Sequence, residues 1–192
     1  MRLLLGVTGG IAAYKAADLA SKAVKDGFVI RVVMTEAATR FVAPMTFEAL
    51  TGEPVMTSAW GTSRPEPGQP GGESTIDHIR WAKWAQVACI VPLTASTLGR
   101  LACGLADDAL TTVWLALPAS VPSVLFPAMN TEMWLNPIVQ RNVGWIEEHG
   151  RHRVVRPVEK RLACGDLGVG ALPEVPEILT ELRGERDRLQ RL

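Results

Sequence analysis

Four short motifs of this 192-residue chain carry side chains that could transfer protons or bind anions. The first is DHIRWAKWA, in which His78 follows a stretch rich in Pro, Gly and Ser. An imidazole with an ordinary pKa of about 6.5 accepts a proton at neutral pH, so His78 is a candidate general base. A lone His is also commonly structural or simply exposed, and this motif alone leaves both interpretations open.

The second motif, KRLACGDLGVGALPE, places Cys164 between a basic pair and a glycine-rich run. Lys160 and Arg161 would lower the pKa of its thiol below the free value of about 8.5, which favours a proton-donor or thiolate role. The other two cysteines, Cys89 and Cys103, stand in apolar runs typical of small buried side chains. Three cysteines without C-x-x-C spacing argue against a disulfide framework and a structural zinc site, so no metal is predicted.

The third motif places Thr8, Gly9 and Gly10 between an apolar run and a helical pattern. Amides at a helix N-terminus suit a phosphate, and glycine lets a ligand approach the backbone closely. The pattern is not G-x-G-x-x-G, and Glu36 follows the next predicted strand instead of ending it. A mononucleotide site is therefore favoured over a dinucleotide site, and a tight turn without a ligand is the alternative.

The fourth motif, FPAMNTEMWLNP, places Ala128, Met129 and Asn130 directly after a buried apolar run. Open parallel sheets bind ligands at the carboxyl ends of their strands. The side chain of Asn130 both donates and accepts hydrogen bonds, so it could hold a carboxylate without adding charge. An Asn after a strand is equally a common helix N-cap, and the spacing leaves the two interpretations open.

The elements that must position these motifs alternate between apolar runs and amphipathic patterns. Runs rich in Val, Ile and Leu predict buried strands over residues 3–7, 28–34, 87–91, 121–126 and, more weakly, 153–156. Amphipathic periodicity predicts helices over residues 11–26, 45–50, 95–101, 106–117, 138–149 and 174–183. Unbroken apolar strands separated by helices indicate an α/β fold whose parallel sheet is covered by helices on both faces.

Composition predicts one globular domain over residues 1–192, because 47% of the residues are apolar and 21% are charged. Residues 57–74 are rich in Pro, Gly and Ser, which predicts a flexible loop that could cover a site. We expect residues 184–192 to form a solvated helical tail. A formal net charge of zero favours neither nucleic acid nor a membrane surface as a partner. Prolines break the apolar stretch 109–129, and glycines end the short N-terminal apolar run, so we expect no membrane span and no targeting segment. The three cysteines without a disulfide pattern suit a reducing compartment, so we expect a cytoplasmic location.

In their order and spacing, the motifs GGIAAYK, MTEAATRFV, DHI, PLTASTLGRLACGLADD, PAMNTEMW and LACGDLGVG form a specific pattern. From residue 3 to about residue 174, the chain resembles the flavin-dependent cysteine decarboxylases, most closely those of coenzyme A biosynthesis. The resemblance implies a flavodoxin-like (Rossmann-like) three-layer fold with FMN as the cofactor. It also implies a homo-oligomer, with the active site between subunits of a homotrimer that in some members assembles into a homododecamer.

The same resemblance assigns roles to individual residues. His78 matches the catalytic base and Cys164 the proton donor, while Asn130 matches the residue that holds the substrate carboxylate. Arg161 and Ala163 match further substrate contacts. The positions that match the FMN-binding residues are Gly9, Gly10, Ile11, Thr35, Glu36, Ala37, Thr94, Ala95, Ser96, Thr97 and Ala128.

The reaction that the resemblance implies converts 4'-phosphopantothenoylcysteine, a small thiol with a phosphate and a carboxylate, to 4'-phosphopantetheine. His78 assists deprotonation while the thiol-bearing carbon is oxidised and carbon dioxide leaves, and Cys164 donates a proton in the returning reductive step. There is no net redox change. The cofactor carries out the oxidation and the reduction, and the protein positions the reactants and excludes water.

Two positions depart from the family's pattern, because Ser96 stands where Asn is common and Gly10 where Ser is frequent. We therefore expect weaker or rearranged FMN contacts instead of their loss. Two related functions remain as alternatives: oxidative decarboxylation of the C-terminal cysteine of a peptide, and a non-catalytic FMN-binding regulatory subunit. Cys164 favours the full reductive cycle over the first, and His78 would be unnecessary in the second.

Overall fold

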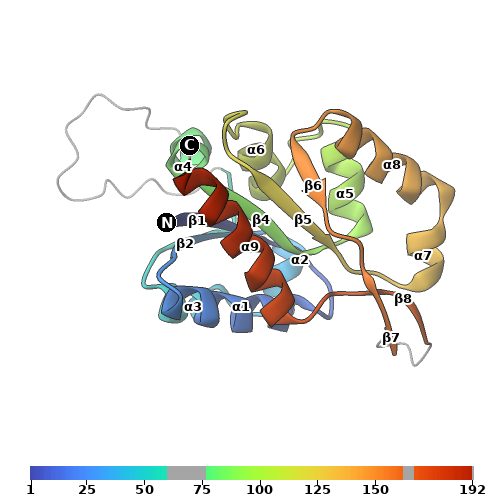
Figure 1. Ribbon diagram of the computed structural model, residues 1–192, viewed down its shortest axis with the longest axis horizontal. Coiled ribbons are helices and arrows are strands. Elements are labelled where there is room, and N and C mark those ends of the chain that lie inside the picture. The colour runs from blue at the N-terminus through green and yellow to red at the C-terminus, as the bar shows by residue number, and fades with distance from the viewer. Residues whose placement is uncertain (60–76, 162–166, 192) are drawn as a thin grey trace.

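The computed structural model describes residues 1–59, 77–161 and 167–191. Its middle layer is a six-stranded parallel sheet in the order β3-β2-β1-β4-β5-β6 (Figure 1). The strands are β1 (Arg2–Val7), β2 (Val29–Met34), β3 (Val55–Met56), β4 (Val87–Leu93), β5 (Ser123–Pro127) and β6 (His152–Val154). An antiparallel hairpin of β7 (Val158–Arg161) and β8 (Leu167–Ala171) extends beyond this sheet, below α7 in Figure 1.

Nine helices of the described residues connect these strands. They are α1 (Ala13–Lys25), α2 (Glu36–Thr39), α3 (Pro44–Thr51), α4 (Asp77–Trp84), α5 (Ala95–Ala102), α6 (Ala109–Leu115), α7 (Thr131–Leu135), α8 (Pro137–Glu148) and α9 (Val175–Gln190). Helices α1, α3 and α9 pack on one face of the sheet, where α9 crosses in front of the strands in Figure 1. Helices α4, α5, α6 and α8 pack on the other face, which completes the three layers.

The strand order confirms the predicted fold class. Without the two-residue edge strand β3, the order β2-β1-β4-β5-β6 is that of a flavodoxin-like sheet, and β3 extends its edge. The order reverses between β1 and β4, which lie side by side although α1, β2, β3 and their connections separate them in the chain. A sheet of this kind binds ligands in the crevice at that reversal.

Alternate residues of the strands supply the two cores, as an extended backbone requires. In β1, Leu3 and Leu5 face the α1 side and Leu4 faces the α6 side. The buried face of α1 is mostly alanine, with Leu19 among four alanines. Small side chains let this helix lie close to the sheet, so its first turn stays near the carboxyl ends of β1 and β4.

The predicted strands and long helices are all present, with boundaries shifted by a few residues. Helix α6 begins at residue 109, later than predicted, because Asp108 and Thr111 form a capping box in which Asp108 Oδ1 accepts from the Thr111 amide at 2.7 Å. The short elements β3, α2, α4 and α7 and the hairpin were not predicted.

The structure describes little of the predicted loop and nearly all of the predicted C-terminal tail. Most of the predicted loop 57–74 lies outside the described residues. Helix α9 continues through residues 184–190, and Glu185 within that stretch is buried. Among the described residues, no helix is both long enough and apolar enough to cross a membrane.

Candidate functional site

The carboxyl ends of β1 and β4 are joined by one buried side chain. The hydroxyl of Thr8 donates to the Pro92 carbonyl at 2.7 Å and accepts from the Thr94 amide at 3.0 Å. The chain leaves β1 toward α1 on one face of the sheet and leaves β4 toward α5 on the other. Thr8 therefore fixes the two loops on either side of the crevice.

A cavity of about 640 Å³ opens at this crevice, a size suited to a small organic ligand. Seven predicted site residues line it: Gly10, Ile11, Thr94, Ala95, Ala128, Asn130 and Arg161. They come from the ends of β1, β4 and β5 and from the hairpin, four regions that are far apart in the sequence. Nine further residues of the described part of the chain also line it: Ala12, Tyr14, Lys15, Pro92, Met129, Met133, Gly170, Ala171 and Leu172.

The loop after β1 approaches the loop after β2 so closely that only glycine fits. A Cβ at Gly9 would collide with the side chain and backbone of Ala37. Ala12 provides no side-chain cap for α1. In the first turn the amides of Ala13 and Lys15 donate to the carbonyls of Gly10 and Ala12, which leaves the Tyr14 amide for a ligand or solvent. Of the residues predicted after β2, Thr35 caps α2 through its hydroxyl, while Glu36 and Ala37 are exposed beyond the cavity lining.

The loop after β4 is held by its own helix cap. Thr94 Oγ1 accepts from the amide of Thr97 at 3.4 Å and donates to the Thr97 hydroxyl at 3.3 Å. Thr94 and Ala95 line the cavity, whereas Ser96 is exposed and Thr97 is buried beneath the loop. Thr97 therefore supports the loop instead of lining the cavity.

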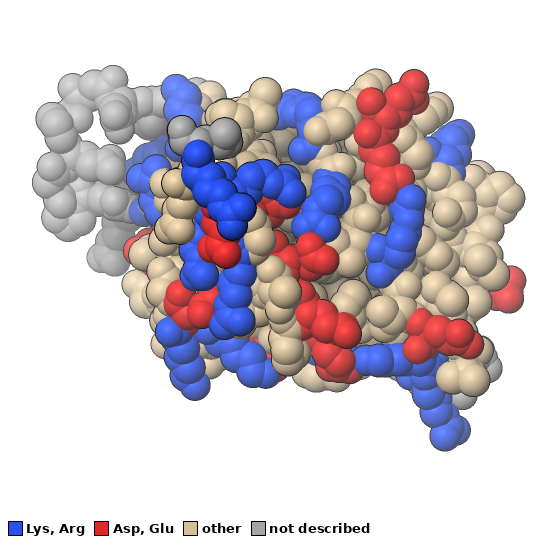
Figure 2. All heavy atoms as spheres, viewed as in Figure 1, with Lys and Arg blue, Asp and Glu red and all other residues tan. Residues whose placement is uncertain are grey.

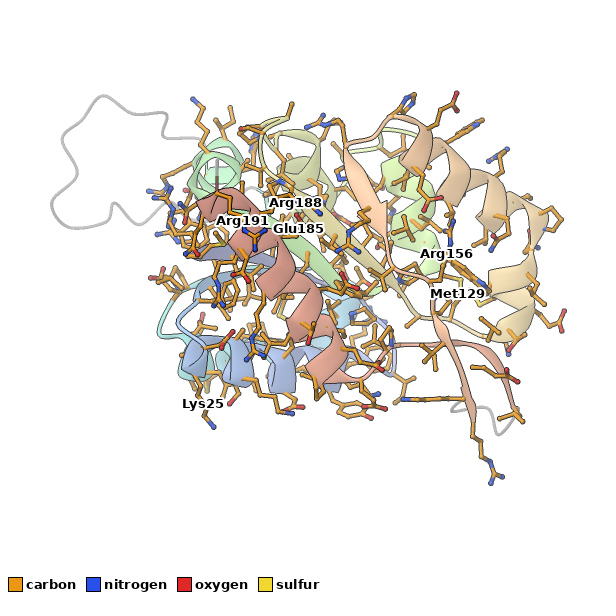
Figure 3. The ribbon with its side chains drawn as sticks, viewed as in Figure 1. Lys25, Met129, Arg156, Glu185, Arg188 and Arg191 are labelled. Carbon is orange, nitrogen blue, oxygen red and sulfur yellow. The ribbon has the colours of Figure 1, made fainter. Side chains whose placement is uncertain are left out.

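Asn130 has one of the two roles that its sequence left open, that of a helix N-cap. Its Oδ1 accepts from the Glu132 amide at 2.8 Å and caps α7, and the residue also lines the cavity. Its neighbour Met129, labelled in Figure 3, lies where β5 passes toward α7, and its amide donates to the Gly170 carbonyl at 2.9 Å. A Cβ at Gly170 would collide with the Met129 carbonyl oxygen, so glycine lets the hairpin pack directly on this loop.

Arg161 brings positive charge to the cavity from the last residue of β7. The predicted contact Ala163 and the predicted proton donor Cys164 lie outside the described residues.

His78 is not brought to this cavity within one chain. It is the second residue of α4, half-buried, and it is not among the lining residues. Helix α4 buries Trp81 and Ala82 against the face of the sheet opposite α1. The predicted base and the predicted carboxylate-binding residue Asn130 therefore belong to separate regions of the protomer.

Lys15 lines the cavity and was not singled out in the sequence. It lies in the first turn of α1, directly after the glycine loop predicted to bind a phosphate, and that position is the signal that could have found it. Its Nζ lies 3.4 Å from Glu174 Oε2, and Lys160 of β7 binds the other oxygen of that carboxylate. The hydrogen bond from Lys160 and the charge of Lys15 hold the pKa of Glu174 below its usual value.

The two cysteines expected in apolar surroundings differ. Cys89 is fully buried in β4, and burial raises the pKa of its thiol, so the prediction is confirmed there. For Cys103 it is wrong, because that residue is exposed where α5 ends in a turn at Gly104, which has a φ of +66°. Neither cysteine lines the cavity.

Sequence relatives match nearly the whole chain. A probable phosphopantothenoylcysteine decarboxylase of Streptococcus mutans is 40% identical over 94% of this chain and 96% of its own length. The coenzyme A biosynthesis bifunctional protein CoaBC of Bacillus subtilis is 43% identical over 94% of this chain. The chain spans 41% of the length of that bifunctional relative, so it matches only part of it.

Solved structures share the fold over the same extent. A PPC decarboxylase variant in complex with pantothenoylaminoethenethiol superposes with a TM-score of 0.80 at 33% identity, over 95% of this chain and 96% of its own. The FMN-binding protein AtHal3 superposes with a TM-score of 0.77 at 34% identity, over 95% and 94% of the two chains. The family model named Flavoprotein matches residues 1–186. With this match, the strand order and the cavity at its reversal, the chain belongs to the Flavoprotein family.

Proposed function

We propose that this protein is an FMN-dependent decarboxylase that converts 4'-phosphopantothenoylcysteine to 4'-phosphopantetheine in coenzyme A biosynthesis. One observation carries the proposal. Loops from three strands and a hairpin combine Gly10, Thr94, Ala128, Asn130 and Arg161 around one cavity, in a chain 40% identical over nearly its full length to a probable decarboxylase of this kind.

The cavity fits FMN. Its lining is mainly apolar, as a flavin ring requires, and the glycine loop with the uncapped start of α1 suits the phosphate. Gly9, Gly10 and Ile11 would hold the phosphate and ribityl chain, with Thr35, Glu36 and Ala37 beside Gly9. The loop from Thr94 to Thr97 and Ala128 would border the ring. When bound, FMN supplies reversible two-electron oxidation of the substrate.

The chain's own residues bind the substrate and move protons. Asn130 lines the cavity, and its Oδ1 accepts a hydrogen bond from the Glu132 amide of α7. Its side-chain NH2 group would donate to the substrate carboxylate and orient it. Arg161 would provide a charge-assisted contact to an anionic part of the substrate. His78 would take up the proton during oxidation, and Cys164 would return one in the reductive step. The closed site would exclude water.

The position of His78 supports a homo-oligomeric enzyme, a trimer or a dodecamer built from trimers. Within one protomer His78 lies away from the cavity lining, so a second copy would supply it. Ile11, Tyr14 and Met133 line the cavity and are largely exposed in the single chain, which supports their burial by another subunit. We also propose a cytoplasmic location, because three cysteines without C-x-x-C spacing suit a reducing compartment.

The decisive experiment combines the visible spectrum of the purified protein with carbon dioxide release. The wild type is expected to carry FMN, to show transient bleaching with 4'-phosphopantothenoylcysteine and to release carbon dioxide. His78→Asn should stay yellow and lose at least about 100-fold in decarboxylation, since a positioned base contributes that much.

A matched control is His149→Asn, which changes an exposed histidine at the end of α8 and should retain wild-type activity. Full activity of His78→Asn would remove His78 from the mechanism. If 4'-phosphopantothenoylcysteine yields no carbon dioxide while a peptide with a C-terminal cysteine does, the proposed substrate is wrong.

A further inference from the structure

The described lining of the cavity carries positive charge only. Among its described lining residues, the ionised side chains are Lys15 and Arg161, and none is a carboxylate. Over the rest of this face, basic and acidic groups are interspersed on α1 and α9 (Figure 2), with pairs such as Arg183 and Asp26 at 2.8 Å. The excess of positive charge is therefore a property of the cavity, in a chain whose formal net charge is zero.

Lys15 is held at the cavity by a carboxylate that it shares. Its side chain is 19% exposed, and its Nζ lies 3.4 Å from Glu174 Oε2. Lys160 binds Glu174 Oε1, so two ammonium groups share one carboxylate. The backbone of Glu174 is fixed by the capping box of α9, in which its amide donates to Glu177 Oε2 at 2.8 Å. Glu174 therefore orients Lys15 without neutralising both cations.

We propose that Lys15 binds a phosphate monoester, that of the substrate, and so determines specificity for phosphorylated thiols. This inference rests on the proposed function. An ammonium group has three donors and attracts a phosphate dianion as a point charge. Lys15 is linked to the hairpin side of the cavity, because its partner Glu174 also binds Lys160 of β7, the neighbour of the lining residue Arg161. Lys15 is accordingly assigned to the substrate side.

The test measures binding instead of turnover. Isothermal titration calorimetry of the FMN-loaded protein compares 4'-phosphopantetheine with pantetheine, which lacks only the phosphate. The wild type should bind the phosphorylated ligand at least about tenfold more tightly, and Lys15→Met should lose most of that preference. Lys22→Met is the matched control, because Lys22 lies on the same helix but pairs with Asp18 at 2.6 Å, away from the cavity lining. It should keep the wild-type preference.

A second titration distinguishes the phosphate of the substrate from the phosphate of FMN. The apoprotein is titrated with FMN and with riboflavin, which lacks the phosphate. If Lys15→Met loses the preference for FMN over riboflavin but keeps that for 4'-phosphopantetheine, Lys15 binds the cofactor phosphate and the substrate assignment is overturned. If both preferences stay as in the wild type, the phosphate role itself is overturned. A wild type that fails to decarboxylate 4'-phosphopantothenoylcysteine refutes the proposed function separately, because both binding arms still report on Lys15.

Discussion

Two basic side chains are largely withdrawn from solvent, and their surroundings differ. Arg31 of β2 points into the core beneath α4, with its side chain 11% exposed and its Nε 3.1 Å from Glu53 Oε2. Its guanidinium carbon lies 4.7 Å from the ring centroid of Trp84 and 5.5 Å from that of Trp81. Lys15 contacts one carboxylate, which it shares with a second lysine, and it lines a cavity.

The difference shows that burial of a charge does not by itself indicate a binding site. Two tryptophan rings and a carboxylate lie beside the guanidinium of Arg31, a combination that suits its planar shape, and Arg31 is not among the described residues that line the cavity. Lys15 borders open volume, and its local charge is unbalanced. Arg31 should therefore contribute to stability and Lys15 to ligand binding, and substitutions at three residues test that distinction.

The largest effect on stability is expected at Arg31. Arg31→Ala should lower the free energy of unfolding by about 3 kcal/mol, because it removes the partner of Glu53 and the cation between two tryptophans. Arg31→Lys should cost less, about 1–2 kcal/mol, since it keeps the charge but loses the planar stacking. Urea unfolding followed by far-UV circular dichroism measures both. A change below about 0.5 kcal/mol in Arg31→Ala would show that this cluster does not stabilise the core.

A smaller, pH-dependent effect is expected at Glu174. Lys160 and Lys15 lower its pKa, so the folded state favours the ionised carboxylate. The resulting stability is fully present above the ordinary carboxyl pKa, and it is lost as the pH falls through the lowered pKa of the folded state. Because Glu174 is half-exposed, Glu174→Gln should cost only about 0.5 kcal/mol at pH 7 and nothing once the wild-type carboxyl is protonated. Unfolding curves at pH 7 and in acid measure this difference. An equal difference at both values would exclude the two lysines as its cause.

The smallest effect on stability is expected at Lys15 itself. Lys15→Met keeps the length of the side chain and removes one weak, partly exposed ion pair, so the free energy of unfolding should change by less than about 0.5 kcal/mol. The same urea titration measures it, on the variant that is expected to lose the phosphate preference. If Lys15→Met were as destabilising as Arg31→Ala, Lys15 would be a structural cation and the contrast with Arg31 would disappear.

Most of the architecture could be predicted from local patterns. Apolar runs indicated β1, β2, β4 and β5, and amphipathic periodicity indicated α1, α5, α8 and α9. The sequence also pointed to Gly10 and Asn130, because turn glycines and polar residues that directly follow buried strands are local signals, whereas Thr94 was indicated by the family resemblance alone. The missed elements β3, α2 and α7 have two to five residues, too few to show a period, whereas α4 is as long as the predicted helices α3 and α5.

The sequence by itself determined the strands, the helices and the chemical types of the residues at the carboxyl end of the sheet, because these depend on neighbours a few positions away. Only the tertiary structure decided which of those residues meet. It brought Arg161 and Asn130 to one cavity, joined Lys15 to Glu174 across 159 positions, and left His78 outside that cavity within one protomer. Such contacts depend on strand order, on register and on how close two loops can pack, and no local pattern encodes these properties.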